Sequence, residues 1–169
     1  MKAWNGQNRF FELECLMNSK FGPDSIDWKI LELLQRNARL SNSEIGRSVG
    51  LSQPAVTGRI QRLEDGGIID GYAARLNPKR MGREITAVFR LKTTHAQLRP
   101  CLKALNAVPE VLDVWRLTGE DCLLIKGAFE RMSQVESLVD KLATFGELTT
   151  SFVLGAYAAK PLTRGRDKD

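Results

Sequence analysis

Side chains able to hydrogen-bond to the edges of nucleic-acid bases recur at helical spacing between Ser52 and Gly66. If Val56 marks the centre of the inward face of a helix, with 100° of rotation per residue, Ile60 and Leu63 lie within about 40° of it. The opposite face and its flanks carry small, amide, hydroxyl and guanidinium groups, at Pro54, Thr57, Gly58, Gln61 and Arg62. The major groove of B-DNA admits such a helix and is read by such groups. The pattern favours DNA binding over the alternative, a small helical module that contacts nothing.

Two shorter helical segments precede this one and would set its orientation. An apolar stripe at near-helical spacing, which Ser25 or Asp27 could cap, predicts the first helix; it consists of Ile26, Ile30, Leu31, Leu33 and Leu34. The second begins with a capping box of Ser41 and Glu44 and ends at Gly50, a residue suited to the left-handed conformation. Only Leu51 then precedes Ser52, a second good N-cap. Two capped helices joined by so tight a turn predict a helix-turn-helix.

The same region resembles the Lrp/AsnC (feast/famine) family of transcription regulators. The runs that carry the resemblance are IDWKILELLQ (26–35), RLSNSEIG (39–46), VGLS (49–52), VTGRIQRLE (56–64) and GIIDGY (67–72). Their order and spacing match the family, and the resemblance extends from about residue 26 to 158. It implies that the chain is a sequence-specific DNA-binding transcriptional regulator, modulated by an amino acid or similar metabolite.

By this resemblance the recognition element spans about residues 52 to 62. The implied DNA-binding residues are Ser52, Gln53, Pro54, Thr57, Gly58, Arg59, Gln61 and Arg62. Those expected near base edges are Gln53, Pro54, Thr57, Gly58 and Gln61, and Arg62 is expected at a phosphate. Arg59 lies about 60° from the inward axis at 100° per residue, so a salt bridge, for which Glu44 is one candidate partner, competes equally with a phosphate contact.

The rest of the chain predicts an α+β fold in which an N-terminal three-helix helix-turn-helix domain is joined to a C-terminal ferredoxin-like βαββαβ sandwich. Alternating or apolar runs predict strands over 85–92, 111–117, 122–129 and 148–157, with amphipathic helices over 98–105 and 132–142. Five parts are expected: an N-terminal extension (1–25), the DNA-binding domain (26–70), a linker with an extended segment (71–84), the assembly and ligand-sensing domain (85–158) and a basic tail (159–169). The first 16 residues could reflect a misassigned translation start before Met17.

A sandwich of this kind leaves one face of its sheet uncovered. Packing two such faces together predicts a symmetric homodimer, whose paired recognition helices could read half-sites about one duplex turn, or a multiple of it, apart. The family resemblance adds higher oligomers and an amino-acid effector bound between subunits.

The residues implied in ligand binding form the turn between the second and third strands, with a weaker candidate on the last strand. They are Thr118, Gly119, Glu120, Asp121, Cys122 and Thr150. Glycine would let backbone amides approach a carboxylate, and an acid would meet an ammonium group. This chain departs from the family's commoner Gly-x-x-Asp pattern, because Cys122 takes the acidic position and Asp121 precedes it. The alternative is a turn that only supports assembly.

Composition limits which partners, cellular location and cofactors are expected. A net charge of +5 suits an anionic partner without requiring one. Residues 1–22 lack the order of a secretory signal, and no apolar stretch approaches the roughly 18 residues of a membrane span, so a cytoplasmic protein is expected. Cys15, Cys101 and Cys122 are widely spaced and His95 is the sole histidine, so no metal or cofactor is expected.

Two alternatives to a local regulator stay open. A nucleoid-organising protein of the same family would wrap DNA with little sequence preference. Siroheme decarboxylases also resemble this two-domain family, but by that resemblance they need a histidine where this chain has Val114-Trp115-Arg116-Leu117. An enzyme is therefore not expected.

Overall fold

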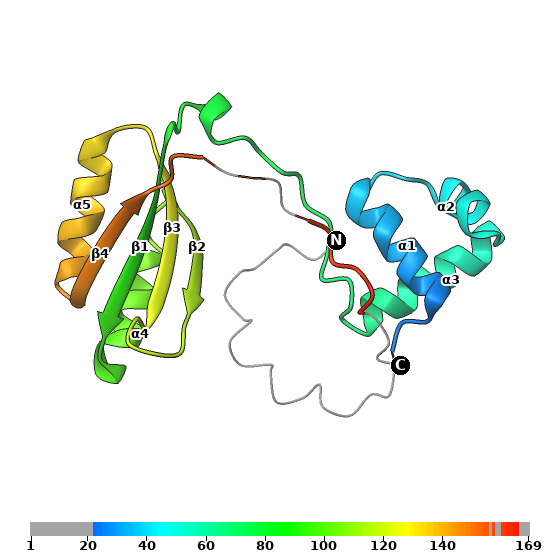
Figure 1. The fold of residues 1–169 in the computed structure, drawn as a ribbon, viewed down its shortest axis with the longest axis horizontal. Coiled ribbons are helices and arrows are strands. Elements are labelled where there is room, and N and C mark those ends of the chain that lie inside the picture. Colours follow the sequence, from blue (N-terminus) through cyan, green and yellow to red (C-terminus); the bar gives the residue numbers. More distant parts are fainter. Residues whose placement is uncertain (1–21, 156, 158–159, 166–169) are drawn as a thin grey trace. The chain divides into compact units, whose positions relative to one another are not determined.

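The computed structural model describes residues 22–155, 157 and 160–165, which form two compact units (Figure 1). The first unit comprises the described residues up to Ala73 together with 160–165, and the second begins at Ala74. The expectations placed on residues 1–21, including Cys15 and the start at Met17, and on residues 166–169 lie outside the described residues.

The first unit is a three-helix bundle of α1 (Ser25–Arg36), α2 (Asn42–Val49) and α3 (Gln53–Asp65). The capping box of α2 is confirmed, since Ser41 accepts the Glu44 amide and Glu44 accepts the Ser41 amide. The predicted cap of α1 was wrong. Asp24, not Ser25 or Asp27, is the N-cap, and its carboxylate accepts the amides of the two residues Ile26 and Asp27, both at 2.8 Å.

The turn between α2 and α3 is held by a close approach of Leu51 to Gly46. The Leu51 N–H donates to the Gly46 carbonyl at 2.9 Å, and a Cβ on Gly46 would lie 2.5 Å from the Leu51 carbonyl oxygen. Only glycine fits there without moving the backbone. The position therefore fixes how closely α3 follows α2.

The core of this unit confirms the predicted inward face of α3. Val56 and Leu63 are fully buried, and Ile60 packs at the edge of the core. Val56 lies in one cluster with Ile30 of α1 and Ile45 of α2. Burial of the apolar side of α3 against both neighbours leaves its other side outward.

The second unit confirms the βαββαβ order of a ferredoxin-like sandwich. Its elements are β1 (Ile85–Thr93), α4 (His95–Leu105), β2 (Val111–Arg116), β3 (Leu123–Phe129), α5 (Met132–Ala143) and β4 (Gly146–Phe152), preceded by a 3-10 turn, η1 (Lys79–Met81). The antiparallel sheet has the order β2-β3-β1-β4. Apolar residues of both helices and of the strands, among them Phe89, Ile125 and Leu142, form one core.

The last strand is shorter than predicted. It ends at Phe152 rather than Tyr157: after the pair of Ala87 with Phe152, the Val153 amide still donates to the Thr86 carbonyl at 2.8 Å, and no further pairing with β1 follows in the described residues. Leu154 is 98% exposed and has no packing to extend the strand.

The other face of the sheet carries polar and aromatic side chains in register. Trp115, Leu124, Arg90 and Thr149 are cross-strand neighbours in one row, and they alternate with the buried residues under the helices. Ion pairs also lie on this face, including Lys126 with Asp113 at 3.7 Å. Trp115 remains 45% exposed.

Gly46→Ala tests the tight turn. The new methyl must displace the Leu51 carbonyl, so we expect the unfolding free energy of the first unit to fall by about 1–3 kcal/mol, the usual cost of overpacking. Gly58→Ala is the matched control on α3, where a Cβ meets nothing within 4 Å. It should stabilise the helix by about 0.5–1 kcal/mol. Calorimetric unfolding of both variants checks the opposite signs, and equal shifts would refute this reading of the turn.

Candidate nucleic-acid interface and ligand loop

The structure brings most of the sequence-predicted DNA-binding residues together on the exposed side of α3. Exposed positions there are Ser52, Gln53, Pro54, Thr57, Gly58, Gln61 and Arg62. Ser52 occupies the N-cap position, although its side chain makes no capping bond, and Pro54 lies in the first turn, where its missing N–H costs little. The helix therefore presents a face of amide, hydroxyl and guanidinium groups, as expected from the 3.6-residue period.

The first turn of α2 adds two residues that the sequence analysis missed. The Asn42 side-chain amide donates to the Thr57 hydroxyl at 2.8 Å, and the Ser43 hydroxyl donates to the Gln53 side-chain oxygen at 3.2 Å. Thr57 in turn donates to the Gln53 carbonyl at 3.0 Å. These bonds hold the N-terminal half of α3 and the start of α2 as one polar surface. The sequence signal was available, because both missed residues directly follow the Ser41 cap.

Arg59 turns toward the start of α1 instead. Its guanidinium NH1 lies 2.7 Å from carboxylate oxygens of both Asp24 and Asp27. Asp27 is buried, whereas Glu44, the expected partner, is bound to Ser41. The expected partner was therefore wrong, but the structure supports the salt-bridge alternative for Arg59. The ion pair ties α3 to the first turn of α1.

The ion-pair cluster of Arg59, Asp24 and Asp27 shifts the pKa values of Asp24 and Arg59. The Asp27 backbone amide and the Arg59 guanidinium hold the pKa of Asp24 at about 2, well below its usual 3.8. Hydrogen bonds from Asp24 and Asp27 in turn raise the pKa of Arg59. The charged forms of both partners are thus the ones that the folded bundle favours.

The predicted ligand loop connects β2 to β3. The Leu117 amide donates to the Cys122 carbonyl and the Cys122 amide to the Leu91 carbonyl, both at 2.9 Å. Gly119 has φ +104°, a conformation that side-chain-bearing residues rarely adopt. The Cys122 thiol lies 3.0 Å from the Thr93 carbonyl oxygen and donates to it. The thiol therefore joins the loop to the end of β1.

A cavity of about 240 Å³ opens beside this loop. Its lining residues are Thr93, Thr94, His95, Leu98, Arg116, Leu117, Gly119 and Cys122. Gly119 and Cys122 were expected here from the sequence, whereas Arg116 and His95 were not. His95, expected in a loop, is instead the first residue of α4. Helix N-terminal amides and a guanidinium suit a carboxylate group.

The other predicted ligand residues lie elsewhere. Asp121 forms a 3.5 Å ion pair with Arg90 on the open sheet face. Thr150 is on β4, the edge strand opposite β2, where it pairs with Phe89, and so lies away from the loop. Thr118 and Glu120 are exposed. None of these four lines the cavity.

Within the described ranges, no cluster of three or more histidine, cysteine or acidic side chains is placed to hold a metal ion. Among those same residues, no helix has the length and apolar character needed to cross a membrane.

Comparisons with known proteins agree on both units. Residues 24–64 match the profile of the AsnC-type helix-turn-helix domain, and residues 86–162 match that of the Lrp/AsnC ligand binding domain. The chain is 40% identical over 97 residues to the HTH-type transcriptional regulator Ptr1 of Methanocaldococcus jannaschii, covering 57% of this chain and 66% of Ptr1. It is 33% identical over 138 residues to the DNA-binding transcriptional activator DecR of Escherichia coli, covering 78% of this chain and 91% of DecR.

A solved structure is similar along most of its length. The transcriptional regulator NMB0573 of Neisseria meningitidis, determined as a complex with L-Met, matches with a TM-score of 0.75 and 32% identity. The match covers 82% of this chain and 95% of that one.

Asp24→Asn tests the ion-pair cluster through its pH dependence. The folded-state pKa of Asp24 is depressed from 3.8 to about 2, so its carboxylate stabilises the folded state above about pH 4. That contribution is lost as pH falls from about 4 to 2. We expect the wild-type protein to be more stable than the variant at pH 6, with the difference shrinking across that window. Urea unfolding at each pH measures it, and a difference independent of pH would contradict the assignment.

Proposed function

The chain belongs to the Lrp/AsnC family of transcription regulators, and on that premise we propose that it binds a specific DNA sequence as a homodimer and responds to an amino acid or similar metabolite. The observation that carries the proposal is the exposed polar side of α3, fixed from below by Val56 and Leu63 and continued by the first turn of α2. A helix so held can enter a major groove without rearrangement of its bundle.

Different residues of this face suit different parts of the duplex. The amide side chains of Gln53 and Gln61 suit the adenine edge, which offers one donor and one acceptor. To bind there they exchange bonds made within the protein, since Gln53 accepts from Ser43 at 3.2 Å and Gln61 donates to Asp65 at 2.9 Å. Thr57 already uses its hydroxyl within the protein, so its methyl group is the part best placed to contact a thymine methyl. Gly58 has no side chain to hold the helix away from the DNA, and Arg62 supplies a charge for a phosphate.

Dimerisation would use the open face of the sheet. Trp115 is 45% exposed there, next to charges of both signs that include Asp113 and Lys126. A two-fold axis places each patch against its own copy, which allows acids of one subunit to meet bases of the other. The two recognition helices could then read half-sites about one turn of duplex apart.

The effector site would be the cavity beside the 117–122 loop. Arg116 and the first amides of α4 favour a carboxylate, which every free amino acid carries. The similar regulator from Neisseria meningitidis was determined with L-Met bound, which supports an amino acid as the ligand class. No acidic side chain lines the described cavity, so the ammonium group needs a partner from outside it, which a second subunit could provide.

Arg62→Ala tests the DNA contact. If Arg62 neutralises one phosphate, the variant should lose affinity by a similar factor on all DNA sequences, and the slope of log K against log salt should shrink by about 0.9. Arg99→Ala removes the same charge from an exposed position on α4 and should leave the slope unchanged. Fluorescence titrations between about 50 and 200 mM salt measure both. An unchanged slope for Arg62→Ala removes this residue from the interface.

Arg116→Ala tests the ligand site. Loss of a charge-assisted hydrogen bond worth about 1.5–3 kcal/mol should weaken binding of the effective amino acid about 10- to 100-fold. The matching amine without a carboxylate should not bind the wild-type protein, and Lys103→Ala, an exposed position on α4, should bind normally. Calorimetric titration with a panel of L-amino acids provides the measurement. An amine that binds as tightly as its amino acid would rule out carboxylate recognition.

A further inference from the structure

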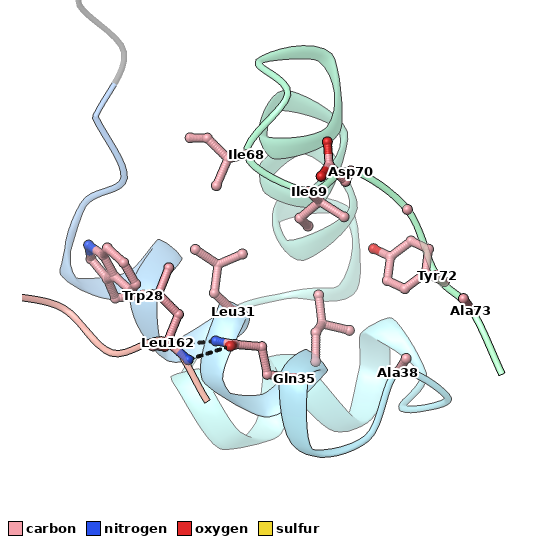
Figure 2. Close-up of a pocket in the computed structure, with 12 residues that line it drawn as sticks. Trp28, Leu31, Gln35, Ala38, Ile68, Ile69, Asp70, Tyr72, Ala73 and Leu162 are labelled. Carbon is pink, nitrogen blue, oxygen red and sulfur yellow. Dashed lines mark hydrogen bonds between the residues drawn. The ribbon is translucent and has the colours of Figure 1, made fainter. Parts of the chain in front are cut away.

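The DNA-binding unit has a groove of about 360 Å³ along α1, here called the α1 groove (Figure 2). Its lining is mainly apolar and comes entirely from the first unit: Trp28, Leu31, Leu34, Gln35, Ala38, Ile68, Ile69, Asp70, Gly71, Tyr72, Ala73 and Leu162. One wall is α1, and another is the chain that follows α3. Neither the helix-turn-helix contacts nor the ligand loop uses this groove.

A segment distant in sequence is already bound at its edge. The Gln35 side-chain amide donates to the Leu162 carbonyl at 2.9 Å, and its oxygen accepts the Leu162 backbone N–H at 2.7 Å (Figure 2). These two residues are 127 positions apart. The contact is therefore tertiary and not a local turn.

The chemistry of this contact is that of peptide recognition. A carboxamide presents a donor and an acceptor side by side, as a neighbouring strand does, so it can satisfy both backbone groups of one extended residue. The Leu162 side chain is 73% exposed, so the groove binds the backbone more than the side chain. Pro161 helps, because a residue before proline is restricted to extended conformations, which keeps Lys160 extended.

The groove lies where the DNA-binding unit connects to the rest of the chain. Residues 71–73, which form part of its wall, begin the linker to the second unit, and residues 160–165 follow that unit in the chain. Both connections of the DNA-binding unit therefore meet at one groove. Tyr72 also donates a hydrogen bond to Glu64 of α3 at 3.0 Å, which joins this wall to the recognition helix.

We propose that the edge of the α1 groove at Gln35 is a docking site for an extended peptide segment and that the segment docked there is 160–165 of the same chain. Docking adds a second attachment of the DNA-binding unit beside the 71–84 linker. The recognition is directed at the backbone of Leu162 and depends on Gln35. It requires no DNA and no effector, so its failure would leave the proposed function untouched.

Hydrogen exchange of the full-length protein tests the contact. The Leu162 amide should exchange about tenfold more slowly than an unprotected amide, a factor that corresponds to about 1.4 kcal/mol. In Gln35→Leu, which keeps a side chain of similar size but no carboxamide, the protection should disappear. Gln97→Leu makes the same change at an exposed position of α4 and should retain it. Exchange of Leu162 at the unprotected rate in the wild type, or equal protection in Gln35→Leu, overturns the proposal.

Photocrosslinking decides whether the docked segment belongs to the same chain or to a second copy. The photoreactive p-benzoylphenylalanine replaces Leu162 in a mixture of ordinary and ¹⁵N-labelled chains that have been unfolded and refolded together. We expect crosslinks to the peptide containing Trp28 and Leu31, because both residues line the groove with Leu162. In each crosslinked pair, the peptide carrying position 162 and its partner should carry the same isotope. Pairs of mixed isotope would show that a second copy supplies the segment and would overturn the same-chain assignment, as would the absence of any crosslink to this peptide.

Discussion

Burial of the apolar side of α3 is the constraint on which the rest of the DNA-binding unit depends. Val56 and Leu63 are fully enclosed, and Val56 shares one cluster with Ile30 and Ile45 of the other two helices. Because this contact fixes the rotation of α3, it also decides which side chains remain outside. The Gly46–Leu51 approach then sets how α3 leaves α2. The polar face is the consequence of these apolar and steric contacts.

The two arginines of α3 show that the position of a residue around the helix decides the role of its side chain. Arg59 and Arg62 are three residues apart and chemically identical, yet Arg59 is paired with the buried Asp27 and with Asp24, while Arg62 lies on the exposed side. The buried carboxylate of Asp27 would be destabilising without its partner, so Arg59 is needed to stabilise the bundle. Net positive charge by itself therefore says little about which basic residues are available to DNA.

Much of the fold could be predicted because its signals are local. The Ser41 capping box, the end of α2 at Gly50 and the inward face of α3 all follow from residues within a few positions of each other. The failures required tertiary information. Asp24, the cap of α1, is also held by Arg59 from another helix, and the extent of β4 depends on its pairing with β1, which is distant in sequence. The ligand cavity joins the end of β2 to the start of α4, which no spacing in the sequence reveals, whereas Thr150 is excluded from it by its place in the sheet.

If the outward side of α3 reads base sequence, its glutamines should each specify particular positions in the bound DNA. Selection of bound fragments from random DNA, carried out with the wild-type chain and separately with Gln53→Ala and Gln61→Ala, tests it most directly. We expect a compact two-fold symmetric motif for the wild type, and each substitution should relax the preference at its own position in both half-sites. A motif left unchanged by both substitutions, or the recovery of no motif as a DNA-wrapping protein would give, would contradict it.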